Sequence, residues 1–63
     1  MHKRISYSPT EAGMELDVSR VTIHKLIREG ELKSFKIGRL RRISRDAIDE
    51  YINKQELLAE RGQ

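Results

Sequence analysis

The apolar residues of three segments recur three or four positions apart, which is the spacing of one face of a helix. They are Ala12 and Leu16 in the first segment, Ile23, Leu26 and Ile27 in the second, and Ile48, Tyr51 and Ile52 in the third. Each set lies on one side of its helix and leaves polar residues on the other side. The pattern therefore predicts three amphipathic helices that share one core.

The first helix is predicted to run from Pro9 to about Leu16. Ser8 and Glu11 have the spacing of a capping box, in which each side chain accepts a hydrogen bond from the other residue's backbone N–H. Proline is favoured at the first helical position because its missing N–H would have no partner there. A tight turn is expected next, at Asp17 and Val18, because aspartate tolerates a positive φ better than most residues.

Serine N-caps also precede the other two predicted helices. The second helix is expected over Arg20–Glu29, between Ser19 and Gly30, and the glycine ends it in a left-handed conformation. The third begins at Arg45, and neither proline nor glycine interrupts it before Gly62. The first two helices are therefore joined by a turn of only a few residues.

Between the second and third helices the period of the apolar residues changes to two, which predicts a β-hairpin. Phe35 and Ile37 alternate with polar residues, Ile43 ends the return strand, and residues 38–39 form the turn. A two-stranded hairpin is too small to be stable alone, so we expect Phe35, Ile37 and Ile43 to pack on the helices. Residues 1–7 are expected to lie extended, along the small sheet or along a helix.

In this order, the elements predict a mainly α fold with a small β-hairpin: a winged helix-turn-helix with a two-stranded wing and a C-terminal helix. The 63 residues form a single domain, with a core over about 5–54 and a C-terminal helical extension over about 55–63. A domain of this size buries roughly 60% of its unfolded surface. Leu57 and Leu58 lie in the extension. They either contact a neighbouring protein, integrase or another copy, or belong to last turns that fray or lie on the domain's own core.

Positive charge is concentrated in the middle of the chain. The net charge is only +3, but residues 20–45 contain nine Lys and Arg against two Glu, which gives a local balance of +7. The nineteen residues before this segment sum to −1, and the eighteen after it sum to −3. A concentrated positive field suits a polyanion such as nucleic acid, although a charge run by itself is usually an ordinary solvated face.

The polar side of the second helix supplies the first group of candidate DNA contacts. They are Ser19, Arg20, Val21, Thr22, His24, Lys25 and Arg28. The major groove is ~12 Å wide and admits one helix, whose Arg and Lys side chains pair with guanine edges. We expect Arg20, Lys25 and Arg28 to divide between phosphates and base edges.

Three of these candidates have an alternative role. Val21 either touches a thymine methyl group or is a half-buried packing residue. Ser19 either donates to a phosphate, as is expected of Thr22, or serves only as the N-cap of the helix. For His24, a place facing solvent without a base contact is favoured over a role in recognition.

The hairpin supplies the second group of candidates, which are Lys36, Gly38, Arg39, Arg41 and Arg42. Folding does not require the arginines, so we expect them to be free to reach a phosphate backbone or a narrow minor groove. The negative potential of such a groove favours an inserted arginine. Arg39 and Arg41 are the strongest candidates, because the turn has no structural need for them.

The sequence does not predict an enzyme. It has no nucleophile–base pair, no glycine-rich phosphate loop and no carboxylate cluster, and 63 residues leave little room for a substrate pocket of ~300 Å³. With no cysteine and two isolated histidines, His2 and His24, neither a metal nor a cofactor is expected. No apolar run approaches the ~18 residues of a membrane span or the pattern of a signal peptide. We therefore expect a soluble, cytoplasmic protein with no small-molecule substrate.

The chain resembles the excisionase-like small DNA-binding proteins, which are winged-helix relatives of the MerR-type DNA-binding domain. The resemblance rests on VSRVTIHKLIREGEL at 18–32 and KIGRLRRISRDAIDEYI at 36–52, and it covers about residues 5–52. It implies that the helix over Arg20–Glu29 enters the major groove. It also implies that the hairpin around residues 38–39 acts as a wing on the adjacent minor groove or backbone.

The resemblance also implies partners. Members of the group act in phage or mobile-element excision, where they bend DNA and help integrase choose direction, or they act as small transcription factors. For this chain it implies a recombination directionality factor of bacterial or phage origin, whose partners are double-stranded DNA, neighbouring copies of itself and integrase. A MerR-like transcriptional regulator or repressor is the alternative, and a protein-interaction module without DNA binding is a more remote one.

Overall fold

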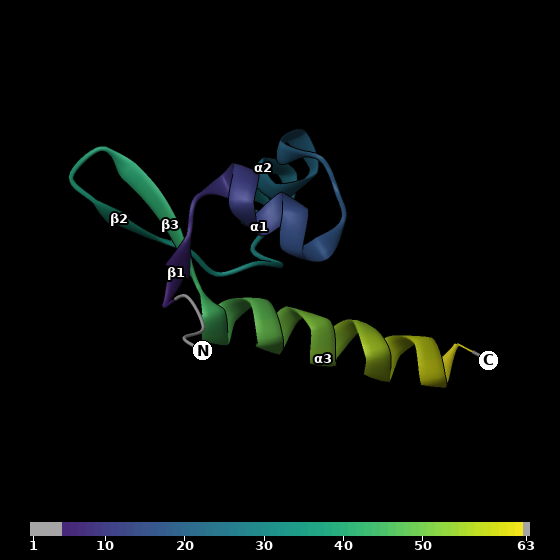
Figure 1. Ribbon diagram of the computed structural model, residues 1–63. Helices are drawn as coiled ribbons and strands as arrows, with labels where there is room; N and C mark the ends of the chain where they lie inside the picture. Colours follow the sequence, from purple (N-terminus) through teal and green to yellow (C-terminus); the bar gives the residue numbers. More distant parts are fainter. Residues whose placement is uncertain (1–4, 63) are drawn as a thin grey trace.

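The computed structural model describes residues 5–62. Residues 1–4, which begin the segment predicted to be extended, and residue 63 lie outside the described residues. The elements in chain order are β1 (Ser6–Tyr7), α1 (Pro9–Leu16), α2 (Arg20–Arg28), β2 (Phe35–Ile37), β3 (Leu40–Ser44) and α3 (Arg45–Arg61) (Figure 1). The predicted fold class is confirmed, and α2 ends one residue earlier than expected.

Serine side chains begin all three helices, as the sequence predicts. Ser8 Oγ accepts the backbone N–H of Glu11 at 3.1 Å, and Glu11 Oε1 accepts the N–H of Ser8 at 2.9 Å, which completes the capping box. Ser19 and Ser44 each accept the N–H group three residues further on, at 3.1 and 3.0 Å. After α2, Gly30 has a φ of +77°, the left-handed conformation expected there.

β3 is the central strand of a three-stranded antiparallel sheet with the order β1-β3-β2. In the pairing of β1 with β3, Ser6 lies opposite Ser44 and Tyr7 lies opposite Ile43. The prediction of a two-stranded hairpin therefore missed a strand, although it expected the N-terminal segment to be extended. A strand of two residues is too short to show a period of two, so the sequence pattern could not distinguish it.

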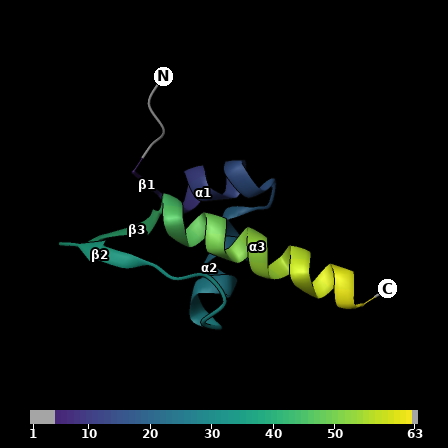
Figure 2. The ribbon, with the colours of Figure 1, turned by 90° about the horizontal axis from the view of Figure 1, so that it is seen from below.

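The core draws on every helix and strand except β2. Its buried side chains are Tyr7, Ala12, Ile23, Leu32, Ile43, Ala47 and Ile48, and Leu16, Leu26, Ile27, Tyr51 and Ile52 pack against them. The inward faces predicted for the three helices are thus confirmed. In Figures 1 and 2, α3 runs beneath α1 and α2 and continues past them, while β2 and β3 project from the other end of the molecule.

The prediction that Phe35 and Ile37 pack on the helices is wrong. They are 41% and 60% exposed, whereas Ile43 is fully buried. Residues opposite each other in an antiparallel pair share a face of the sheet, and here Ile37 lies opposite Leu40 and Phe35 opposite Arg42. Ile43 comes one residue after Arg42 in β3, so it faces the helices while the other apolar residues of the hairpin face outward.

Arg45 joins three elements at the first turn of α3. Its guanidinium donates to Asp49 Oδ1 at 2.8 and 3.1 Å, to Glu15 Oε1 of α1 at 2.9 Å and to the Tyr7 hydroxyl of β1 at 3.1 Å. The hydrogen bonds to Asp49, Tyr7 and Glu15, in that order, raise the pKa of Arg45 above its ordinary value. Arg45 belongs to the basic segment of the sequence, but its side chain links α3 to α1 and β1 and is not available as a free cation.

Candidate nucleic-acid interface

A sharp turn fixes the position of α2 relative to α1. Asp17 ends α1 with a φ of +57°, as predicted for this residue. The turn passes so close to Gly13 that a Cβ there would lie 2.7 Å from the carbonyl oxygen of Val18, whose own N–H donates to the carbonyl of Gly13 at 2.8 Å. Ile23 is fully buried and anchors the inner side of α2. The outer side of α2 is thereby held toward solvent.

The outer side of α2 carries the side chains predicted to read DNA. Arg20, Val21, Lys25 and Arg28 are exposed, and Thr22 and His24 are half-buried. Among the described residues, no ion pair engages Arg20, Lys25 or Arg28. Val21 is 78% exposed, so the packing alternative for this residue is wrong, and the contact with a thymine methyl group stays a prediction.

Two hydroxyl groups lie together at the beginning of α2. Ser19 Oγ accepts the N–H of Thr22 and lies 3.1 Å from Thr22 Oγ1. The N-cap role of Ser19 is thus confirmed, while its contact with a phosphate stays a prediction. Of the three described helices, only α2 has no acidic residue in its first turn. The partial positive charge at its N-terminus is therefore not offset by an acidic residue of that turn, which favours a phosphate at this position.

The tip of the wing is a two-residue turn formed by Gly38 and Arg39, between the paired residues Ile37 and Leu40. Gly38 has a φ of +60°, and a Cβ there would meet no atom within 4 Å. The backbone conformation, and not a close contact, therefore favours glycine at this position. Within the part of the chain that the structure describes, the exposed side chains of Lys36 and Arg39 make no hydrogen bond or ion pair.

The other two arginines of the wing are not free, contrary to the prediction. Arg42 Nε donates to Ser6 Oγ and Arg42 Nη2 donates to the carbonyl of Ser6, both at 3.2 Å, which ties β3 to β1. Arg41 Nη1 donates to Ser34 Oγ at 3.1 Å. Ser6 is 36 residues from Arg42, so spacing along the sequence gives no sign of this contact. The DNA contacts of both arginines stay predictions.

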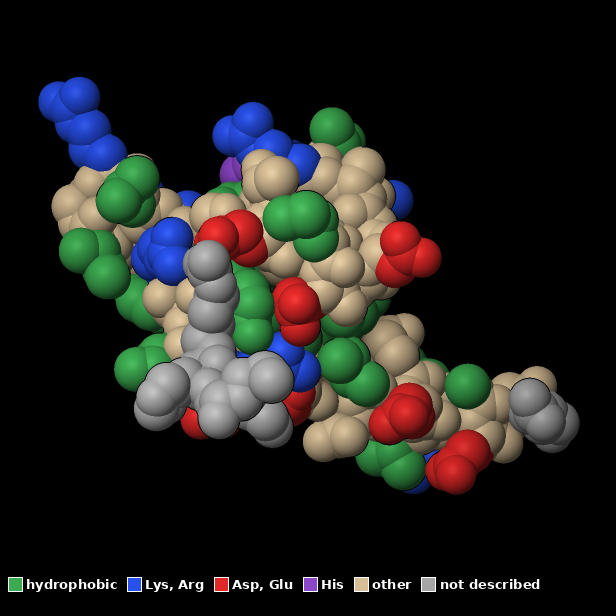
Figure 3. Space-filling model, viewed as in Figure 1, with side chains coloured by type: hydrophobic (Ala, Val, Ile, Leu, Met, Phe, Trp, Pro, Cys, Tyr) green, Lys and Arg blue, Asp and Glu red, His purple; other side chains and the backbone are tan. Residues whose placement is uncertain are grey.

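The unpaired cations of α2 and the wing form what we call the basic edge, defined as Arg20, Lys25, Arg28, Lys36 and Arg39. In Figure 3, Lys and Arg side chains gather at the tip of the wing and over α2, while acidic side chains lie over α1 and α3. Two lysines outside this edge are paired: Lys33 with Glu50 at 3.2 Å and Lys54 with Glu31 at 3.0 Å. A helix and a neighbouring hairpin with free cations match a groove and its adjacent phosphates.

The fold and the basic edge define a winged helix-turn-helix protein. A family model described as "Helix-turn-helix domain" matches residues 6–56, and the chain belongs to this family. It is 44% identical over 48 residues to a protein from Saccharopolyspora erythraea named "Probable excisionase". The match covers 76% of this chain and 49% of that protein, so the chain spans about half the length of this relative. No solved structure shows significant similarity.

The comparisons confirm the predicted resemblance to excisionase-like helix-turn-helix proteins. They do not extend to the MerR-type domain, so that relation stays a prediction. The family points to DNA binding without catalysis. Within residues 5–62, no three His, Cys, Asp or Glu side chains form a group that could hold a metal. No helix in the same range is both long and apolar enough to cross a membrane.

Proposed function

We propose that the protein binds double-stranded DNA with α2 in the major groove and the wing on the adjacent minor groove or backbone. The basic edge is the observation that carries this proposal. Its five cations have no ion-pair partner among the described residues. The buried side chain of Ile23 anchors α2 in the core, and that of Ile43 anchors β3, the strand that pairs with β2. Like charges gathered on one edge repel each other and contribute nothing to folding, whereas they attract a polyanion.

The position of each cation suggests its role in the complex. Arg20 lies in the first turn of α2 and binds a phosphate together with the helix N-terminus. Lys25 and Arg28 lie one and two turns further on, where side chains reach base edges as well as phosphates. Arg39 projects from the tip of the wing into the minor groove, and Lys36 contacts the backbone beside it.

We further propose that the protein is a phage or mobile-element excisionase. In this role it binds adjacent sites on attachment-site DNA cooperatively, bends the duplex and directs integrase toward excision. The name of the relative from Saccharopolyspora erythraea supports this role. One recognition helix with one wing corresponds to an interface of roughly 600–1,000 Å², which favours a protein that gains affinity from its neighbours on DNA.

Selection of bound fragments from the surrounding genome, at near-physiological salt and read by sequencing, tests the biological role. Closely spaced repeated sites beside an integrase gene are expected. A single inverted site at a promoter would contradict the excisionase role and indicate a repressor, since dimeric repressors match palindromic half-sites. No enrichment at any salt concentration would contradict DNA binding itself.

A salt titration with the selected site tests the basic edge. The logarithm of the affinity should fall with the logarithm of the salt concentration, with a slope of about −0.9 for each contacted phosphate. Lys25→Ala and Arg28→Ala should weaken binding, whereas Lys54→Ala is the matched control because it removes a lysine paired with Glu31. Equal losses in all three variants would show that net charge, and not the basic edge, determines binding.

A further inference from the structure

The outer face of the wing is apolar, although every charge on the wing is positive. Ile37 lies opposite Leu40, and Phe35 comes two residues before Ile37, so these three side chains share one face of the hairpin. Ile37 and Leu40 are the more exposed of the three, at 60% and 65%. Residues 35–44 include four cations and no acidic residue. Exposed apolar clusters commonly mark contact surfaces, and the charges around this one favour a polyanion.

The register of the hairpin orders its side chains by their distance from the tip. Gly38 and Arg39 form the turn, and the pair of Ile37 and Leu40 comes directly behind it. Because each strand residue adds about 3.3 Å, this pair lies about 3 Å behind the turn, and Phe35 lies about 10 Å behind it. The minor groove is about 7.5 Å deep. A groove that takes up Arg39 therefore also meets Ile37 and Leu40, whereas Phe35 stays outside it.

The chemistry of the minor groove changes with depth in a way that matches this order. Base edges form its floor, the C–H groups of deoxyribose line its walls, and phosphates lie along its rim. Arg39 suits the floor, and Lys36, on the other face of the hairpin, suits the rim. We propose that Ile37 and Leu40 pack against the deoxyribose wall of the minor groove that holds Arg39. The wing then binds DNA by an apolar contact as well as by its charges.

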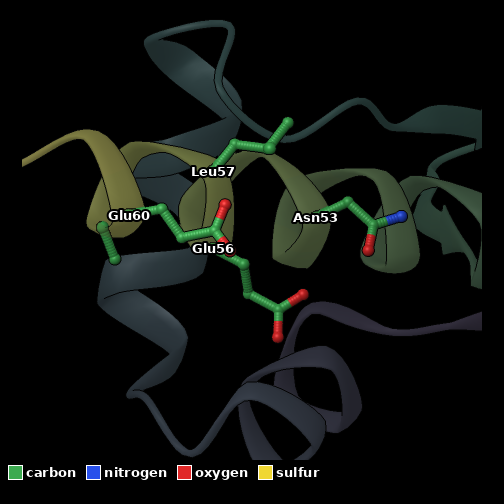
Figure 4. A pocket seen from close by; sticks show the side chains of 5 residues that line it. Asn53, Glu56, Leu57 and Glu60 are labelled. Atoms are coloured by element: carbon green, nitrogen blue, oxygen red, sulfur yellow. The ribbon is translucent and has the colours of Figure 1, made fainter.

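An exposed leucine on α3 lies in the opposite electrostatic environment. Leu57 is 59% exposed, which is close to the value for Leu40, but it shares its part of α3 with Glu56 and Glu60 (Figure 4). Neither carboxylate has an ion-pair partner within the described range, so this surface repels a polyanion. Leu57 is therefore the matched control for Leu40, as a leucine of similar exposure that DNA does not approach.

This inference deepens the proposed function and rests on it, because it names residues through which the wing binds DNA. A cation that binds DNA releases counterions, so its contribution to affinity falls as salt is added. Burial of an apolar side chain removes C–H groups from water and releases no counterions. A salt titration therefore separates the apolar contact from the contacts of the basic edge.

The first test is binding to a short duplex with a single selected site, measured by fluorescence anisotropy across a salt series. Leu40→Ser and Ile37→Ser should each weaken binding about 10-fold, as expected when part of an aliphatic side chain is no longer buried, and should keep the salt slope of the unmodified chain. Arg39→Ala should instead make the slope shallower by about 0.9. Leu40→Ile and Leu57→Ser should keep the unmodified affinity. Circular dichroism melting shows that each variant is folded at the assay temperature.

The second test locates the contact by alkylation of single cysteines, because the chain contains no cysteine of its own. A saturating amount of the single-site duplex should slow alkylation of Leu40→Cys several-fold and that of Phe35→Cys less. Alkylation of Leu57→Cys should keep its rate. A duplex with one site holds one copy of the protein, so a neighbouring copy on the DNA cannot cause the protection.

The outcomes separate this inference from the proposed function. If Leu40→Ser binds as well as Leu57→Ser while Lys25→Ala binds weakly, the inference is overturned and the proposed function stands. A Leu40→Ser chain whose salt slope also becomes shallower overturns the inference, because the leucine then acts by positioning Arg39. Protection of Leu40→Cys without DNA overturns it as well, since another copy then covers this face. If the unmodified chain binds no duplex, the proposed function itself fails, and the inference fails with it.

Discussion

Replacing Arg39 or Arg42 by alanine removes the same charge from the same hairpin, yet the two variants should fail in different ways. Arg39 is exposed and has no partner among the described residues. Its loss should change the free energy of unfolding by no more than about 0.5 kcal/mol, which corresponds to a shift in Tm below about 4 °C. Loss of a direct contact with DNA should cost about 1–3 kcal/mol of binding free energy.

Arg42 should show the opposite behaviour. Its guanidinium donates two hydrogen bonds to Ser6, and β1 contains only two residues to hold it in the sheet. Hydrogen bonds from a charged donor contribute about 1.5–3 kcal/mol each when buried, and solvent screening at this half-buried site reduces the pair to about 1–2 kcal/mol in total. The Tm of Arg42→Ala should therefore fall by about 4–16 °C, while the folded variant keeps most of its affinity for DNA.

Circular dichroism melting and fluorescence anisotropy across a salt series measure both quantities on the same samples. Arg39→Lys is the matched control, because it keeps the charge but not the planar guanidinium, so it should restore the salt slope and only part of the affinity. The reasoning is refuted if Arg39→Ala melts as early as Arg42→Ala. It is equally refuted if Arg42→Ala, measured well below its Tm, binds as weakly as Arg39→Ala.

Three further predictions concern the scaffold. Gly13→Ala should lower the Tm, because a Cβ 2.7 Å from a backbone oxygen costs about 1–3 kcal/mol of overpacking, which outweighs a gain of about 1 kcal/mol in helix propensity. A raised Tm would show that the turn moves to accommodate the methyl group without loss of stability. Gly38→Ala should lower the free energy of unfolding in urea by about 1–2 kcal/mol, because φ is +60° at this position, and Gly38→Asn should lower it less, because asparagine adopts a positive φ more readily. Equal decreases in both variants would contradict a conformational cause. Arg45→Met should lower the Tm and shift the NMR signals of the Tyr7 ring, and Arg45→Lys should recover only part of the stability because an ammonium group cannot reproduce the guanidinium fork. An unchanged Tyr7 spectrum in Arg45→Met would contradict the role assigned to this arginine.

The helices and the outer side of α2 could be predicted because their determinants are local. Ser8, Ser19 and Ser44 bind backbone groups only three residues away, so each cap is visible in a short stretch of sequence. The apolar stripe of α2 identifies its buried side, and the opposite side then follows from the helical period. Most of the candidate site on α2 could therefore be assigned before the structure was known.

The features that the sequence did not reveal depend on contacts between distant segments. Neither the pairing of β1 nor the hydrogen bonds from Arg42 to Ser6 leave a periodic signal, because they join residues 36 or more positions apart. The exposure of Phe35 and Ile37 was within reach of the sequence. A turn at residues 38–39 places Ile37 opposite Leu40, which puts both on the face that Ile43 does not share. The error was to assign all three apolar residues of the hairpin to one face.

The short strand β1 has a consequence for how the protein folds and opens. Its partners in β3 lie 36 or 38 residues further along the chain. Pairing of β1 with β3 therefore costs more loop-closure entropy than formation of the hairpin, whose strands are joined by a two-residue turn. During synthesis, β1 has no partner until β3 has left the ribosome. In the finished protein β1 has only two residues in the sheet, so we expect its amide protons to exchange before those of β3 and of the helices, even though the Tyr7 side chain is buried. Opening of β1 would leave β3 with an unpaired edge, which is a site where strand exchange with another chain is possible.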